Sequence, residues 1–137
     1  MKIMPCLAVV VSLLVLPVGD AGTRETLPPD KVVVQNYYYA KPGRADEVYR
    51  WRLHASDVRV NLGFARGRVL RGIDSIDQEG DAKERPDVIW ECDYASMADR
   101  ERESKALGAS DEFKKVQEHM GTLIRRFERG TYRVTSH

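Results

Sequence analysis

The sequence predicts an α+β domain, a four-stranded antiparallel sheet with helices on one face. A β-branched and aromatic segment at 31–40 is followed, after Lys41-Pro42-Gly43, by a helical pattern. A later block, from 87 to 123, repeats this order of strand and then helix, and a separate strand pattern precedes it at 64–73. With a final strand signal, the order is strand, helix, strand, strand, helix, strand, which is the split βαβ arrangement.

The first 22 residues are typical of a secretory signal. Lys2 precedes an uncharged apolar run at 3–18, and small residues follow at Ala21 and Gly22. The run is shorter than the ~20 apolar residues of a membrane-spanning helix, although an uncleaved anchor is the alternative. We therefore expect cleavage near Ala21 or Gly22 and a secreted or periplasmic mature protein.

Removal of residues 1–22 would take Cys6 with it and leave Cys92 as the only cysteine, so no intrachain disulfide is expected. Residues 23–30 contain Pro28-Pro29 and predict an extended lead-in. Residues 31–137 then form the predicted domain.

The charges of the chain are balanced, with 22 Lys and Arg against 21 Asp and Glu. Such a chain has no strong field to attract nucleic acid or anionic lipid. We expect neither as a partner, and no membrane contact beyond the signal segment.

The strand at 31–40 is apolar or aromatic on both of its faces. One face carries Val32, Val34, Asn36 and Tyr38, and the other carries Val33, Gln35, Tyr37 and Tyr39. A strand of this kind is usually covered on both sides, which in so small a domain indicates a partner subunit over one face.

The following helix is predicted from Arg44, with Gly63 as its stop. Its apolar stripe has a spacing of three and four residues and consists of Val48, Trp51, Ala55, Val58 and Leu62. His54 lies beside this stripe, where it is either a boundary residue or a ligand contact.

The next two strands are predicted at 64–73 and 87–95, separated by an acidic loop at 74–86. On the second of them Val88, Trp90, Cys92 and Tyr94 form an apolar face that should pack on the helices. Glu91 and Asp93 would then lie on the opposite side of the sheet.

A helical block follows, with Ser96 and Asp99 as a cap box and Ser110 as the cap of a second helix. Gly121 is a candidate end of that helix, and the final strand is predicted within 122–134 with its start left open. The apolar stripe of the block consists of Phe113, Val116, Met120 and Leu123.

Three segments carry a resemblance to a known superfamily: VVVQNYYYAKPGRADEV, PDVIWECDYAS and ASDEFKKVQEHMGTLIRRFERGTYRV. From about Val32 to Val134 the chain resembles the dimeric α/β barrel proteins, which include NIPSNAP-type proteins, antibiotic-biosynthesis monooxygenases and haem-degrading monooxygenases. It most resembles the NIPSNAP-like branch. The resemblance implies a ferredoxin-like βαββαβ fold, and with the partly apolar outer sheet face it predicts a homodimer across a two-fold axis.

The haem-degrading relatives use an Asn on the first strand, a Trp on the third and a His on the next helix. Asn36 and Trp90 occupy comparable strands, but no His occurs in 97–108 and His119 comes later. No Cys/His cluster has metal-ligand spacing either. We therefore expect no haem, metal or other cofactor.

Five side chains are candidates to line a ligand pocket: Asn36, Tyr38, His54, Arg68 and Glu91. Each also has an ordinary interpretation, such as a cross-strand ion pair between Arg68 and Glu91. Two hypotheses follow. We favour an exported module that binds a small hydrophobic ligand or is purely structural. The alternative is a cofactor-free, monooxygenase-like enzyme for a hydrophobic aromatic substrate, which would need a pocket and a base.

Overall fold

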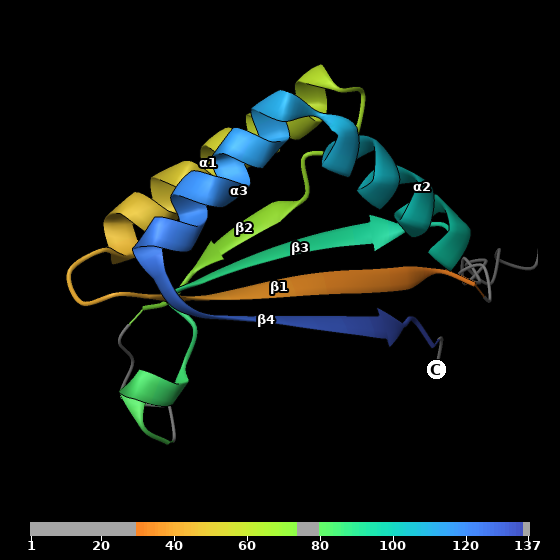
Figure 1. The fold of residues 1–137 in the computed structure, drawn as a ribbon. Coiled ribbons are helices and arrows are strands. Elements are labelled where there is room, and N and C mark those ends of the chain that lie inside the picture. The colour runs from red at the N-terminus through yellow and green to blue at the C-terminus, as the bar shows by residue number, and fades with distance from the viewer. Residues whose placement is uncertain (1–29, 74–79, 136–137) are drawn as a thin grey trace, which may run out of the picture.

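The structure, a computed structural model, describes residues 30–73 and 80–135, which form one antiparallel sheet with helices on one face (Figure 1). The elements are β1 (Val32–Ala40), α1 (Ala45–Asn61), β2 (Arg68–Arg71), the 3-10 helix η1 (Ala82–Glu84), β3 (Val88–Tyr94), α2 (Met97–Ala109), α3 (Asp111–Leu123) and β4 (Ile124–Arg133). The predicted ferredoxin-like α+β fold with a four-stranded antiparallel sheet is confirmed. The signal segment 1–22, residues 23–29 of the lead-in, and 74–79 of the acidic loop lie outside the described residues.

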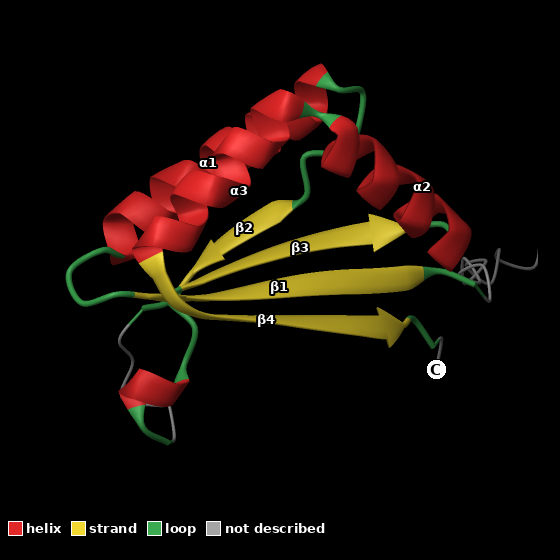
Figure 2. Ribbon diagram, viewed as in Figure 1, coloured by secondary structure: helices red, strands yellow, loops and turns green. Residues whose placement is uncertain are grey.

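The strand order is β2-β3-β1-β4, so the first strand is central and pairs with both β3 and β4. Figure 2 shows α1 and α3 side by side over the sheet, with α2 sloping away from them toward the end of β3. The inner face of β1 is buried beneath these helices, as its alternation predicted. The core consists mainly of this face, the apolar face of β3 and the inner side chains of α1 and α3.

Helix α1 buries a wider surface than its apolar stripe predicted. Val48, Ala55 and Val58 are buried, but Leu62 is 40% exposed because it follows the last helical residue and no longer faces the sheet. Its place in the stripe was a wrong prediction. Arg52, Ser56 and Arg59 are buried instead, although polar side chains of this kind rarely are.

The caps of α2 and α3 follow the predicted pattern. The backbone N–H of Asp99 donates to the Ser96 hydroxyl at 3.2 Å, and that of Phe113 donates to the Ser110 hydroxyl at 3.2 Å. Gly121 does not end α3, which continues to Leu123 and passes directly into β4.

Strand β2 is shorter than its prediction at 64–73, because the chain approaches Trp90 closely just before it. Gly67 has a φ of +71°, and a Cβ there would overlap the indole of Trp90. The indole N–H also donates to the carbonyl of Arg66 at 3.0 Å. This close approach holds residues 64–67 out of the ladder, which begins at Arg68.

The outer face of the sheet carries a polar network interrupted by exposed apolar side chains. The predicted ion pair between Arg68 and Glu91 is present, and these residues oppose each other in the β2–β3 register. The hydroxyls of Tyr37 and Tyr132 lie 3.1 Å apart, and this hydrogen bond, together with burial, raises the pKa of Tyr37 to about 12. Leu70 and Tyr132 are 45% and 49% exposed on this face.

Candidate functional site

A cavity of about 380 Å³ lies between the inner face of the sheet and helices α1, α2 and α3. That volume is within the range of small-molecule sites. Its apolar lining consists of Ala55, Trp90, Leu107, Phe113, Val116, Met120, Ile124 and Phe127. Its polar lining consists of Asn36, Tyr38, Arg52, Arg59, Arg100, Ser104, Gln117 and Arg129. Among the described residues, four arginines therefore line the cavity, and no carboxylate does.

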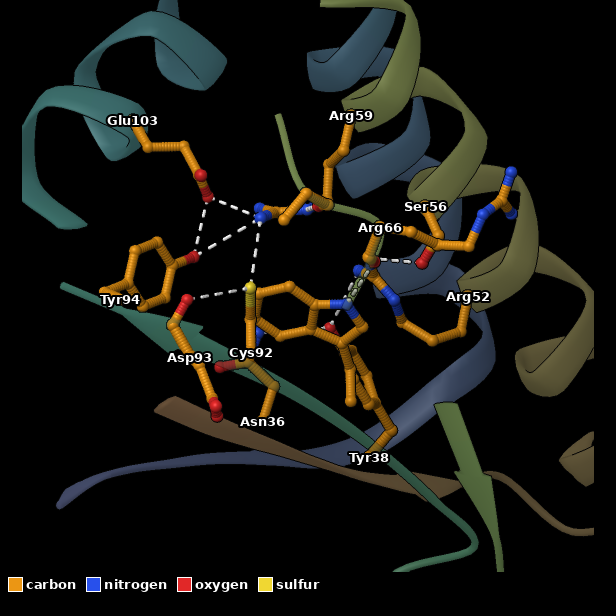
Figure 3. Close-up of polar contacts among 12 residues, drawn as sticks. Asn36, Tyr38, Arg52, Ser56, Arg59, Arg66, Cys92, Asp93, Tyr94 and Glu103 are labelled. Carbon is orange, nitrogen blue, oxygen red and sulfur yellow. Dashed lines mark hydrogen bonds and ion pairs between the residues drawn. The ribbon is translucent and has the colours of Figure 1, made fainter. Parts of the chain in front are cut away.

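Arg52 extends from the buried face of α1 toward the sheet, one turn after Val48. Only 4% of this residue is exposed. Its guanidinium donates to the hydroxyls of Tyr38 and Ser56, each at 3.3 Å, and its carbon lies 4.9 Å from the Trp90 ring centroid (Figure 3). The buried Nε has no hydrogen-bond partner among the described residues, and burial lowers the pKa of the guanidinium.

Arg59 lies two turns further along the same face of α1 and has a very different environment. It pairs with Glu103 of α2 at 2.5 Å, donates to the Tyr94 hydroxyl at 3.3 Å and to the carbonyl of Ala65 at 3.1 Å. Tyr94 in turn donates to Glu103 at 2.6 Å (Figure 3). This buried cluster of Arg59, Glu103 and Tyr94 is internally satisfied, and it fixes α2 to α1 and to the end of β3.

Two further groups in this region titrate outside their usual range. Burial raises the pKa of the Tyr94 hydroxyl, and its hydrogen bond to Glu103 does so too. Burial also raises the pKa of the Cys92 thiol, against the opposing effect of Arg59. Cys92 is therefore a protonated thiol at neutral pH and not an activated nucleophile.

Across the sheet, the register places three polar or aromatic side chains in one row on the cavity side. Asn36 of β1 is opposite Trp90 on β3 and opposite Arg129 on β4. Arg129 donates to the Asn36 carbonyl oxygen at 2.7 Å, and burial of part of this guanidinium lowers its pKa. Asn36 therefore holds an exposed arginine over the cavity.

Of the five predicted pocket residues, the structure brings two together at the cavity, Asn36 and Tyr38. His54 is exposed on α1 and packs edge-on against Trp51, with ring centroids 5.1 Å apart. Arg68 and Glu91 pair on the outer face of the sheet. These three therefore do not line this cavity.

The arginines of α1 were missed by the sequence analysis, although a signal for them exists. Val48, Arg52, Ala55 and Arg59 are spaced by four, three and four residues, which places both arginines within the buried stripe. The predicted stripe counted apolar side chains alone, so it included neither arginine.

The residues present do not fit a haem group. His119 packs on Trp51 with ring centroids 4.0 Å apart and lies 3.6 Å from Glu47, and neither it nor His54 lines the cavity. His137 lies outside the described residues. Within the described residues, no group of three His, Cys, Asp or Glu side chains is placed to hold a metal ion, and no helix is long and apolar enough to cross a membrane.

Comparison with known proteins gives a consistent fold. No protein-family model matches the chain, and no curated protein matches it in sequence. A NIPSNAP family protein of Agrobacterium tumefaciens is similar in structure, with a TM-score of 0.56 and 15% identity over 77% of this chain and 87% of that one. So is SnoaB, a cofactor-independent oxygenase of Streptomyces nogalater, with a TM-score of 0.51 and 14% identity over 79% and 96%.

A dimeric protein of unknown function and ferredoxin-like fold from Bacteroides fragilis has a TM-score of 0.55 and 8% identity, over 76% of this chain and 96% of that one. At these identities the likeness concerns the fold. The predicted resemblance to NIPSNAP proteins and antibiotic-biosynthesis monooxygenases is confirmed at that level.

Proposed function

We propose that this protein binds a small aromatic molecule in the cavity between its sheet and helices, as an exported homodimer and without catalysing a reaction. The observation that carries the proposal is the cavity itself. It is large enough for a ligand of two or three rings, and it combines apolar and aromatic walls with convergent polar groups that could orient a ligand.

Two glycines support the interpretation of this space as a binding site. Gly108 of α2 and Gly121 of α3 line the cavity, and a Cβ at either would meet no atom within 4 Å. Glycine within a helix costs about 0.5–1 kcal/mol relative to alanine. Both glycines are exposed, so they lie where the cavity opens to solvent, and the absence of side chains there leaves room for a ligand to enter.

The outer face supports the dimer. Leu70 and Tyr132 are exposed beside a network of tyrosines and paired charges, and a structurally similar protein is described as dimeric. In size-exclusion chromatography with light scattering, we expect the native protein to be a dimer at micromolar concentration. We expect the double variant Leu70→Asp with Tyr132→Asp to be a monomer. Val60→Asp, an exposed apolar position on α1, is the matched control and should stay dimeric. A monomeric native protein would refute this part.

Export rests on the signal-like segment 1–22. Mass spectrometry of the protein recovered from its source should give a chain that begins near Ala21 or Gly22. An intact Met1 on the mature protein would contradict it.

Binding is tested by native mass spectrometry of protein from its source and by titration with aromatic probes. We expect a bound small molecule. We also expect Gly121→Leu to weaken probe binding while the fold is retained, because Gly121 lines the cavity and a leucine there would occupy part of its opening. The control is Lys115→Leu, which introduces the same side chain on the exposed side of α3, at a position that does not line the cavity. Probe binding unaffected by Gly121→Leu would place the ligand elsewhere.

A second candidate is a cofactor-free oxygenase for an aromatic substrate. In that reaction one atom of dioxygen becomes the carbonyl oxygen that replaces the two hydrogens of a ring CH₂, and the other atom leaves with those hydrogens as water. The row of Trp90, Asn36 and Arg129 on the cavity favours it, as does the structural likeness to SnoaB. Such a reaction begins with loss of a substrate proton, yet among the described residues no carboxylate or imidazole lines the cavity. We therefore favour binding. Dioxygen uptake above the blank with a dihydroxynaphthalene, lost in Asn36→Ala, would reverse this choice.

A further inference from the structure

The cavity has a marked charge asymmetry. Its lining contains four arginines, and the only carboxylate paired with any of them is Glu103, behind Arg59. The other three have no acidic partner among the described residues. Moving a cation out of water is costly unless an anion compensates for it. Of these three only Arg52 is buried, and an apolar ligand alone would not offset the cost of its burial.

Arg52 and Arg59 make the contrast clear because they belong to the same helix face. Arg59 has a carboxylate, a phenol and a backbone carbonyl as partners. Arg52 is equally buried, yet its two contacts are neutral hydroxyls at 3.3 Å and its Nε has none. An arginine with a purely structural role would resemble Arg59.

The surroundings of Arg52 also define where its missing partner would lie. Both of its contacts are hydroxyls, which can turn to donate as well as accept, and the guanidinium also lies against the Trp90 ring at 4.9 Å. Arg129 stands across the sheet, held by Asn36 at 2.7 Å. A ligand here would therefore meet a cationic donor with free capacity, and the exposed ring of Phe127 in the same cavity offers it an aromatic surface.

Resting on the proposed function, we infer that the ligand is an aromatic anion, a carboxylate or a group of like charge, whose negative group binds the buried guanidinium of Arg52. Charge-assisted hydrogen bonds of guanidinium to carboxylate are stronger than those between neutral groups. Specificity at this site thus comes from Arg52, and the apolar wall accepts the rest of the molecule.

The test uses two probes with one aromatic framework: 8-anilinonaphthalene-1-sulfonate, which is anionic, and N-phenyl-1-naphthylamine, which lacks the sulfonate. Affinities are measured by calorimetry and fluorescence for the native protein and for Arg52→Met, Arg52→Gln and Arg52→Lys. The control is Arg50→Met, an exposed arginine on the same helix that lies outside this cavity. Circular dichroism and thermal melting establish that each variant is folded.

We expect the native protein to bind the anionic probe about tenfold or more tightly than the neutral one. In Arg52→Met and Arg52→Gln, the affinity for the anionic probe should fall to within about twofold of the affinity for the neutral probe. The affinity for the neutral probe should stay unchanged. Arg52→Lys should retain part of the preference for the anionic probe, because it keeps the positive charge. Arg50→Met should match the native protein. Because the charge is buried, raising salt from about 50 to about 500 mM should change the preference only slightly.

Equal affinities of the native protein for the two probes would overturn the inference and leave the proposed function standing. So would a preference that survives in Arg52→Met and Arg52→Gln, or one that is lost in Arg50→Met. Failure of both probes to bind the native protein would overturn the proposed function together with the inference.

Discussion

Replacing Glu103 by glutamine should destabilise the domain strongly, because it leaves the Arg59 guanidinium buried without an anion. The pair is 2.5 Å apart, and the side chains are 3% and 9% exposed. Removing one partner of a buried pair typically costs about 3–5 kcal/mol, a large part of the about 5–15 kcal/mol of a whole domain. For about 100 folded residues this corresponds to a fall in melting temperature on the order of 15–25 °C.

The measurement is equilibrium unfolding in urea, monitored by far-ultraviolet circular dichroism. The double variant Arg59→Met with Glu103→Met should recover most of the loss, because it removes both charges and leaves an apolar pair of similar volume. Arg102→Gln is the control, since it breaks the more exposed pair with Asp99 on the same helix and should cost less than about 1 kcal/mol.

The reasoning would be refuted if Glu103→Gln lost less than about 1 kcal/mol, or if the losses in Arg59→Met and Glu103→Met simply added in the double variant. Additive losses would mean that the two side chains stabilise the domain separately, and that α2 is held to α1 by its apolar contacts alone.

Three other predictions test separate features. The pKa of Tyr37 is raised from 10.0 to about 12, so the folded state favours the neutral phenol. The contribution of Tyr37 to stability is therefore intact below pH 10 and is lost as the pH rises toward 12. Tyr37→Phe should reduce that loss and remove a late step from the absorbance titration at 295 nm. Cys92 is buried, so it should react with Ellman's reagent much more slowly in the native protein than in guanidinium. The unfolded chain should show one reactive thiol, or two if Cys6 is retained. A fast reaction in the native protein would contradict the burial of Cys92. Gly121→Ala should raise the free energy of unfolding by about 0.5–1 kcal/mol, measured by thermal unfolding, because a Cβ there meets no atom within 4 Å. Gly43→Ala has the same room for a Cβ but should lower stability, since Gly43 has a φ of +73°. A loss of stability in both variants would show that the space at Gly121 is not free.

The fold was predictable because each element is punctuated locally. Val32 to Ala40 alternates between two faces, Ser110 caps a helix, and Val88 to Tyr94 has one apolar face, so element type and order follow from near neighbours. Element ends were harder where a distant contact decides them. The overlap that a side chain at Gly67 would make with Trp90, 23 residues away, delays the start of β2.

The site was predicted only in part, and the reasons are physical. Asn36 and Tyr38 share the face of Val34, so burial of that face takes them to the cavity. Glu91 alternates with Trp90, which necessarily places it on the other side of the sheet. Arg59 is stable inside because of Glu103, which is 44 residues further along the chain, and no local pattern announces a partner at that distance.

The central position of β1 also governs how the chain can fold. β1 is the first element of the domain, and both of its neighbours come late, since Val32 pairs with Tyr94 on one side and with Arg133 on the other. During synthesis it emerges with two unpaired edges: one can pair only after β3 (Val88–Tyr94) has been made, and the other only after β4 (Ile124–Arg133). Contacts of this sequence separation slow folding, and the open strand is a site for misassembly in the meantime. The sheet can therefore be completed only once β4, the last described strand, has been made.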